Sequence, residues 1–399
     1  MPTKEDEVMS EIITFSPAAS LFGFGALKKL PETLKLRGFN RVLVITDPGV
    51  TRAGILQKTL DLLNGSFNVE VFDEAPAEPH SRDVDQQKQR FGSDFDALLG
   101  LGGGSAMDFA KAMAIIMTHG GSLGDYLEEG SVPGPVIPVI CVPTTSGTGA
   151  QNTQTTVFTI EGIKRGASSE HIRPAASIVD PELTMGLPVA VTRNAGYDAL
   201  MHACESFLAR PFVRIPERPI LYQGGNPYSQ ALSLEAFRSI WASYPTAVSD
   251  GSNREARFGM SLGSHLAGLA FSHSGLGLVH ALASSLGGMI NAPHGECLAA
   301  CTQIGLSYNL KACEDKYAVL AGYMENGDQR PLPPSPKRFI ENLVGLINDL
   351  NLPYKPSVLG LKKADAPTLL KNTLVQTRRI KTNPRPLDDE LLSYIEKGI

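Results

Sequence analysis

Apolar and polar positions follow two different patterns in the two halves of the chain. In the first half, short apolar runs rich in β-branched residues alternate with stretches whose apolar residues are three and four positions apart. The apolar runs lie at 41–47, 67–74, 96–104 and 136–143, and the helical stretches between them include 54–63 and 105–117. This alternation predicts β-α-β units and a doubly wound parallel sheet. We therefore expect a Rossmann-like α/β domain over residues 1–188.

The pattern changes after this first half. Long stretches such as DALMHACESFLA, FRSIWASYPTAV and FIENLVGLINDL keep apolar residues three and four positions apart, which predicts helices. Gly186 and Pro188 favour a break, and Thr192 and Asn194 are candidates to cap the helix that follows. We expect an all-α domain over residues 189–399.

Glycine-rich and polar turns follow the predicted strands. The carboxyl ends of parallel strands meet at one edge of a sheet, and such sheets bind ligands there. In GLGGGSAMD at 100–108, glycines would let the backbone approach a pyrophosphate, and free N–H groups at the helix start would receive its charge. Ser105 and Asp108 also have the spacing of a capping box, so a purely structural turn is the alternative. This half of the chain is expected to hold a dinucleotide cofactor.

Two further strand ends carry candidate nucleotide contacts. The loop PTTSGTG at 143–149 has hydroxyls and small residues that suit phosphates, a ribose or an amide, although an ordinary polar loop has the same composition. Asp47 could accept hydrogen bonds from an adenosine ribose and repel a 2′-phosphate, which favours NAD(H) over NADP(H). A turn residue is the alternative for this aspartate.

Histidines gather in the second half, where five of the eight lie between residues 202 and 294. Asp198 and His202 are four positions apart in a predicted helix, so both project from one face. His280 lies in an apolar run and His294 in the turn that follows, where a neutral imidazole could complete a site. Three nitrogens and one carboxylate oxygen suit Fe(II), Zn(II) or Mn(II). Hydrogen-bonded structural histidines are the alternative.

Composition excludes several classes of function. The 399 residues carry 36 Lys and Arg against 41 Asp and Glu, a formal charge of −5 with no long run of one sign, which argues against nucleic acid as a partner. The sequence has neither a signal-peptide pattern nor a run of eighteen apolar residues, so it predicts no contact with a membrane. The five cysteines contain no Cys-x-x-Cys pair, which argues against a disulfide framework and favours a cytoplasmic location. A segment at 211–227, rich in Pro, Gly and Arg, is expected to be a surface insertion.

Taken in order, GGGSAMDFAK, PTTSGTGA, DALMHACE, HLAGLAF, GLGLVHALA and NAPHGE resemble the motifs of the iron-containing (group III) alcohol dehydrogenase family. The resemblance runs from about residue 12 to NPRP at 383–386. It implies an NAD(P)-dependent oxidoreductase acting on CH–OH groups, with a metal-binding helical domain, a cleft between the domains, and a dimer or larger homo-oligomer. Fe(II) is expected rather than Zn(II). The metal ligands that it implies are Asp198, His202, His280 and His294. The cofactor contacts that it implies are Asp47, Gly102, Gly103, Gly104, Ser105, Thr144, Thr145 and Thr148, to which we add Asp108 and Lys164 as candidates.

The chain departs from the family pattern near the expected nicotinamide position. Relatives usually carry a histidine four residues after the third ligand, where it can assist proton transfer, but Ser284 stands here. His273 lies seven residues before His280 and could compensate, with a helix-start or core role as the alternative. Gln151 and Asn152 follow the second loop, where relatives often have Glu.

A further departure lies near the carboxyl end. The segment before the Asn-Pro pair often carries Asp or a neutral residue in relatives, but here it contains Arg378, Arg379 and Lys381. Arginine presents a planar fork of donors that binds phosphonate, phosphate, sulfonate or carboxylate oxygens in pairs. This favours an anionic aldehyde as substrate, and we take Arg379 with Ser284 and His273 as the catalytic candidates. A solvated basic surface is the alternative.

Three classes of function follow. The leading hypothesis is an NAD(P)H-linked, metal-dependent aldehyde reductase or alcohol dehydrogenase on a short, anionic aldehyde such as phosphonoacetaldehyde or sulfoacetaldehyde, with simple alcohols and diols behind. The second is a lyase similar to dehydroquinate synthase, which uses NAD and a metal without net redox change. The third, motivated by Ser284, is a non-catalytic relative that keeps the fold as a binding module.

Overall fold

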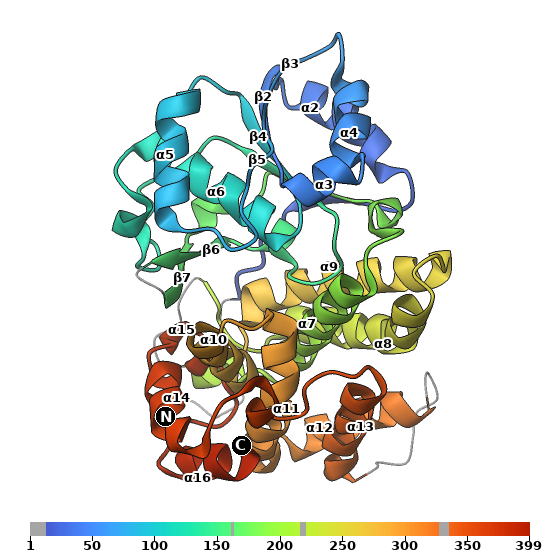
Figure 1. Ribbon diagram of the computed structural model, residues 1–399, viewed down its shortest axis with the longest axis vertical. Helices are drawn as coiled ribbons and strands as arrows, with labels where there is room; N and C mark the ends of the chain where they lie inside the picture. Colours follow the sequence, from blue (N-terminus) through green and yellow to red (C-terminus); the bar gives the residue numbers. More distant parts are fainter. Residues whose placement is uncertain (1–12, 161–162, 216–220, 327–334) are drawn as a thin grey trace, which may run out of the picture.

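The computed structural model describes residues 13–160, 163–215, 221–326 and 335–399. The sheet-containing half, coloured blue to green, lies above the helical half, coloured green to red, in Figure 1. Residue 12, where the family resemblance begins, lies outside the described residues, as do residues 216–220 of the expected surface insertion.

A six-stranded parallel sheet forms the centre of the first half, in the order β1-β8-β5-β4-β2-β3. The strands are β1 (Ala19–Phe22), β2 (Arg41–Ile45), β3 (Asn68–Phe72), β4 (Ala97–Gly102), β5 (Val139–Pro143) and β8 (Ala176–Val179). The predicted parallel α/β sheet is confirmed. β4 and β5 are buried along their whole length, which explains why both read as unbroken apolar runs. β1 escaped prediction because it is a short edge strand whose first two residues are exposed.

Helices cover both faces of the sheet because successive strand residues point to opposite faces. On β2, Val42 and Val44 pack in one core with the helices of residues 30–63, and Leu43 and Ile45 pack in a second core with those of residues 81–119. These helices are α2 (Leu30–Leu36), α3 (Pro48–Arg52), α4 (Ile55–Leu63), α5 (Ser81–Phe91) and α6 (Gly104–His119). Because α6 begins directly after β4, its first turn lies at the carboxyl edge of the sheet.

An antiparallel hairpin and several short turns complete the first half. The hairpin consists of β6 (Thr155–Ile160) and β7 (Ile163–Ser168), and it lies at the side of the sheet that faces the helical half (Figure 1). The 3-10 turns of the whole described chain are η1 (Ala26–Lys29), η2 (Leu123–Tyr126), η3 (Ala150–Asn152), η4 (Glu170–Ile172), η5 (Pro181–Thr184), η6 (Phe212–Arg214), η7 (Leu310–Ala312), η8 (Pro356–Leu359) and η9 (Lys363–Asp365).

The second half is helical, as predicted, and its helices other than the short α15 share one apolar core. They are α7 (Val189–Leu208), α8 (Pro227–Ser249), α9 (Arg254–Ser274), α10 (Leu278–Ile290), α11 (His294–Asn309), α12 (Glu314–Asn326), α13 (Pro336–Asp349), α14 (Ala366–Leu374), α15 (Thr377–Ile380) and α16 (Glu390–Gly398). No single described helix is long and apolar enough to cross a membrane; α9 and α10 pass that test only as a pair, and they are bent by 100°.

The predicted capping of α7 was wrong. The helix begins at Val189 after Pro188, with no side-chain cap, so Thr192 and Asn194 lie inside its first two turns. The Thr192 hydroxyl instead accepts a hydrogen bond from buried Arg257 at 2.9 Å. Local spacing could not reveal this, because the partner lies on α9, 65 positions away.

The two halves meet where the loop after β5 crosses α9. Gly149 has a φ of +62°, and a Cβ there would lie 2.6 Å from the Gly268 Cα, so neither position has room for a side chain. One turn further, the buried Asn152 amide donates to the His265 backbone carbonyl at 2.9 Å and lies 3.0 Å from the ring Nδ1. This close crossing holds the second glycine-rich loop against the helical half.

Candidate metal and cofactor site

Three predicted metal ligands converge on one point in the helical half. The nearest ligand atoms of Asp198 on α7, His280 in the first turn of α10 and His294 at the start of α11 all lie within 4.8 Å of one another. The Asp198 Oδ1 lies 3.4 Å from His280 Nε2 and 3.8 Å from His294 Nε2. His202 lies one turn after Asp198, with its Nε2 3.5 Å from the same oxygen. Its ring is stacked on that of His280, with centroids 4.6 Å apart.

The donor set fits a small divalent cation. The Asp198 Oδ1 and His280 Nε2 atoms are buried and have no hydrogen-bond partner, which is costly unless a cation binds them. Ligands at about 2.0–2.2 Å from a tetrahedral ion stand roughly 3.3–3.6 Å apart, close to the separations found here. Three nitrogens and one oxygen suit iron or zinc.

Burial favours the neutral, metal-binding form of His202 and His294, whereas the carboxylates of Glu205 and Asp198 raise the pKa of His280 against the effect of burial. Burial lowers the pKa of His202 to about 4 and that of His294 to about 3. Burial by itself would raise the pKa of Asp198, but the three surrounding imidazoles lower it overall. For His202, His294 and Asp198, these shifts favour the neutral imidazoles and the ionised carboxylate that metal binding needs.

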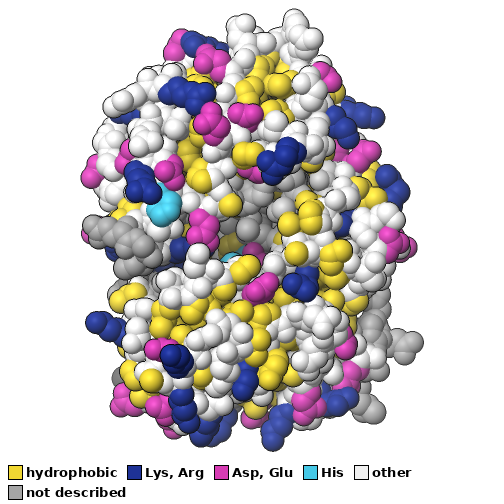
Figure 2. Space-filling view, in the orientation of Figure 1, with side chains coloured by type: hydrophobic (Ala, Val, Ile, Leu, Met, Phe, Trp, Pro, Cys, Tyr) yellow, Lys and Arg dark blue, Asp and Glu magenta, His cyan; other side chains and the backbone are white. Residues whose placement is uncertain are grey.

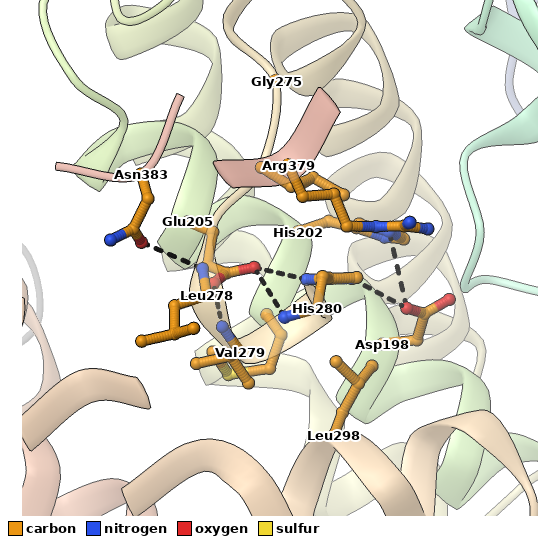
Figure 3. Close-up of polar contacts among 12 residues, drawn as sticks. Asp198, His202, Glu205, Gly275, Leu278, Val279, His280, Leu298, Arg379 and Asn383 are labelled. Carbon is orange, nitrogen blue, oxygen red and sulfur yellow. Dashed lines mark hydrogen bonds and ion pairs between the residues drawn. The ribbon is translucent and has the colours of Figure 1, made fainter. Parts of the chain in front are cut away.

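Glu205 supports this cluster, and the sequence interpretation assigned it no role. The His280 Nδ1 donates to Glu205 Oε2 at 2.5 Å, which aims Nε2 at Asp198 (Figure 3). The same carboxylate accepts the backbone N–H of Val279 at 2.7 Å and that of His280 at 3.3 Å. It therefore holds both the start of α10 and the orientation of the third ligand. The spacing Asp198, His202, Glu205 on one helix was the available signal, but the partner lies 75 positions away.

Neutralising Glu205 should weaken metal binding. Glu205→Gln keeps an acceptor for the Val279 N–H but removes the negative charge beside the His280 imidazole. We expect the metal dissociation constant to rise about 10- to 100-fold. Competition with a chelator of known affinity measures this, with exposed Glu255→Gln as the charge-matched control. Equal affinities in the two variants would contradict the assigned role.

The predicted cofactor loops lie side by side at the carboxyl edge of the sheet. The Thr144 N–H donates to the Gly102 carbonyl at 2.9 Å, which joins the second loop to the first. A Cβ on Gly104 would lie 2.6 Å from Thr148 Cγ2, and one on Gly102 would lie 3.1 Å from Asp47 Oδ2. The three strand ends that the sequence singled out are therefore in contact.

A cavity of about 990 Å³ lies between the two halves and joins these loops to the metal ligands. On the face shown in Figure 2, the surface is hollowed between the halves. The predicted site residues that line the cavity are Gly104, Ser105, Asp108, Thr148, Lys164, Asp198, His202, His280, Ser284, His294 and Arg379. Of the described candidates, those outside its lining are Asp47, Gly102, Gly103, Thr144, Thr145 and His273.

For Asp108 and Asp47, the sequence left open a purely structural role at a turn or helix start, and the structure gives a different answer for each. The capping box of Ser105 and Asp108 was wrong: α6 has no side-chain cap, and Asp108 Oδ2 accepts the Val157 N–H at 3.1 Å. Asp47 does cap a helix, because its Oδ1 accepts the N–H groups of Gly49 and Val50 at the start of α3. Its second carboxylate oxygen has no hydrogen bond within the described chain and is free for a ligand.

His273 does not reach the cavity, which contradicts its proposed catalytic role. It lies in the last turn of α9, where its Nδ1 bonds the Leu269 carbonyl at 2.8 Å and its Nε2 accepts the Ser16 N–H at 3.1 Å. Phe15 packs on its ring, and burial lowers the pKa of His273 to about 4. A histidine with both nitrogens bound to backbone has a packing role. Ser284, by contrast, lines the cavity one turn after His280.

The basic carboxyl-terminal segment faces the cavity, so the solvated-surface alternative was wrong. Arg378, Arg379 and Lys381 all contribute to its lining. The expected surface insertion is also corrected in its described part: Ile215 and Tyr222 are buried, and Tyr222 lines the same cavity. The basic segment and the 211–227 segment are both far in sequence from the cofactor loops, and the fold brings both of them to the same cavity.

Comparison with known proteins identifies the fold and the class. Residues 17–181 match the family model for iron-containing alcohol dehydrogenase, and residues 192–397 match that for the Fe-containing alcohol dehydrogenase carboxyl-terminal domain. The chain belongs to the iron-containing alcohol dehydrogenase family. It is therefore an oxidoreductase of the alcohol dehydrogenase type.

Relatives in this family differ in substrate. The chain is 33% identical over 378 residues to long-chain-alcohol dehydrogenase 1 of Geobacillus thermodenitrificans, covering 93% of this chain and 92% of that protein. It is 31% identical over 385 residues to the sulfoacetaldehyde reductase of Bilophila wadsworthia, covering 94% and 95%. The solved structure of a 1,3-propanediol oxidoreductase has a TM-score of 0.88 and 30% identity, covering 98% of this chain and all of that one. Membership in the family leaves the substrate open.

Proposed function

We propose that this alcohol dehydrogenase is a metal- and NAD(P)(H)-dependent reductase of short, anionic aldehydes, working reversibly on the matching alcohols. The observation that carries the proposal is the shared cavity. Its lining includes the cluster of Asp198, His280 and His294, the two loops that contain Gly104 and Thr148, and the basic segment near the carboxyl end. We assign residues 1–188 to dinucleotide binding and residues 189–399 to the metal and the substrate.

The assigned cofactors follow from the donor set and the loops. A divalent ion bound by Asp198, His202, His280 and His294 would polarise the substrate carbonyl, while the nicotinamide would supply the hydride. Fe(II) is preferred to Zn(II) because the family is iron-containing. For the dinucleotide, we propose that the paired loops accept the pyrophosphate at the first turn of α6.

The residues of the chain mostly hold the reactants in place. Phe271 stacks on the His202 ring with centroids 4.3 Å apart and lines the cavity, so it keeps water from one side of the cluster. Ser284 lies one turn after His280, where we propose that its hydroxyl passes a proton between solvent and the substrate oxygen. Lys164, paired with Glu78 at 2.9 Å, lies at the cofactor side of the cavity.

Asp47 should set the preference for NADH over NADPH. Its free oxygen can bond a ribose hydroxyl and would repel a 2′-phosphate. Asp47→Gly should narrow the ratio of the kcat/KM values for the two coenzymes, and glycine at this helix start costs only a few tenths of a kcal/mol. A wild-type enzyme that already prefers NADPH, with Arg52 binding the phosphate, would overturn this assignment.

A panel of aldehydes tests the function. After reconstitution with Fe(II) or Zn(II), phosphonoacetaldehyde, sulfoacetaldehyde, neutral short aldehydes and diols are offered with NADH and NADPH. Net loss of nicotinamide absorbance with an anionic aldehyde supports the proposal, and turnover of diols alone would replace it with a general short-chain dehydrogenase. Product formation without net absorbance change would identify the lyase. We further propose a cytoplasmic homodimer or larger homo-oligomer that binds neither nucleic acid nor membrane.

A further inference from the structure

Five cations line the cavity, and two of them are already paired with carboxylates. The five are Lys164, Arg165, Arg378, Arg379 and Lys381. Lys164 pairs with Glu78 at 2.9 Å and Lys381 with Glu129 at 3.0 Å. Arg165 is exposed at the rim. The two neighbouring arginines of α15 are thus the partly buried cations without a carboxylate partner among the described residues.

Arg378 is occupied by the sheet-containing half. Its Nη1 donates to the Ser168 hydroxyl at 2.6 Å and to the Thr155 hydroxyl at 3.4 Å. Its guanidinium also lies over the Tyr222 ring, 5.2 Å from the centroid. These contacts tie α15 to the β6–β7 hairpin across the cavity. Both hydrogen bonds use Nη1, so the hydroxyls and the ring fix the place and orientation of this guanidinium.

Arg379 has the opposite environment. Its Nη1 donates to Gln376 Oε1 at 2.6 Å, but its Nε is buried and has no hydrogen-bond partner. Burial, followed by repulsion from Arg378, lowers the pKa of Arg379 to about 10. An incompletely bonded cation in a buried place binds an anion strongly, because an anion supplies both charge and acceptors.

Arg379 also lies beside the metal ligands. It interacts electrostatically with Asp198 and with His294, and Figure 3 shows its guanidinium above that cluster. A divalent ion and Arg379 would bring three positive charges against the two carboxylates of Asp198 and Glu205, so the loaded site would carry a net positive charge. The other acids of the lining do not offset it, because Asp108 faces Lys111 at 3.4 Å and Glu128 is exposed.

We propose that Arg379 alone binds the anionic group of the substrate, and that Arg378 is a positioning residue that holds α15 against the hairpin. This inference rests on the proposed reductase function and deepens it. Because Arg379 lies next to the ligands that would hold the carbonyl end, the anionic group must be only a short tether from the carbonyl carbon. The substrate class is a two- or three-carbon aldehyde with a terminal phosphonate, sulfonate or carboxylate.

The first experiment measures anion binding without turnover. Ethylphosphonate, which cannot react, is titrated calorimetrically into metal-reconstituted wild-type, Arg379→Ala, Arg379→Lys, Arg378→Ala and Lys371→Ala enzymes. Lys371 is exposed on α14, so its replacement removes the same charge without touching the cavity. We expect the dissociation constant to rise about 10- to 100-fold in Arg379→Ala and less in Arg379→Lys, since a point charge cannot reproduce the fork. Lys371→Ala should bind like the wild type.

The second experiment separates the two arginines during turnover. The ratio of KM for phosphonoacetaldehyde to KM for propionaldehyde should rise about 10- to 100-fold in Arg379→Ala. In Arg378→Ala, both KM values should change by the same factor, because a displaced α15 disturbs both substrates.

The outcomes are distinct. The inference is overturned if ethylphosphonate fails to bind wild-type enzyme that reduces propionaldehyde, and also if Arg378→Ala rather than Arg379→Ala loses the anion. If the wild-type enzyme reduces no aldehyde, the proposed function is wrong. Calorimetry with ethylphosphonate would still decide whether Arg379 binds the anion. Near-wild-type melting temperatures confirm that each variant is folded.

Discussion

His280→Ala and His294→Ala should each lose bound metal and catalytic turnover together. The two nitrogens lie 3.4 and 3.8 Å from Asp198 Oδ1, so each alanine removes one corner of a single donor set. Loss of a residue that merely orients a ligand costs about 10- to 100-fold in metal affinity, and loss of a ligand itself should cost at least about 100-fold. Metal analysis after Fe(II) reconstitution, with NADH oxidation on the same samples, measures both quantities.

A histidine outside the site is the control for this pair. His119 bonds the Gly134 carbonyl at 3.1 Å in the sheet-containing half, so His119→Ala should keep its metal. Full metal content in both site variants would remove the ligand assignment. Full metal with lost turnover would move these histidines from metal binding to a role in substrate contact.

Lys111→Met should destabilise the sheet-containing half and disturb the cofactor loop. The buried Lys111 ammonium donates to the Ala150 carbonyl at 2.6 Å and to the Thr153 hydroxyl and Thr155 carbonyl at 2.9 Å. Removing it takes the ammonium donor away from three buried oxygens and leaves Asp108 without its cation. Breaking such a buried pair costs about 3–5 kcal/mol of unfolding free energy.

The effect of Lys111→Met should appear in two measurements. The melting temperature should fall, and KM for NADH should rise, because the freed segment continues directly from Thr148. Lys58→Met, at an exposed position of α4, makes the same chemical change without these contacts. If both variants melt alike, the buried ammonium contributes nothing net to the fold.

The amino-acid sequence by itself determined the elements and the places where strands end. Short apolar runs and apolar repeats three and four positions apart are local properties, so β2, β4, β5 and α6 could be read directly from them. The strand-end motifs at Asp47, 100–104 and 143–149 could be expected to meet because parallel strands place their carboxyl ends at one edge. The same local rules failed for β1, whose exposed edge position removes the apolar signal.

Only the tertiary structure decided which side chains work together. Glu205 reaches His280 across 75 positions, and Arg378 reaches Ser168 across 210, so no spacing rule connects them. Two adjacent arginines with equal sequence signals received opposite environments, one bonded to hydroxyls and one left open beside the metal ligands. Packing made this choice, because a side chain's partners depend on which distant elements are folded against its own.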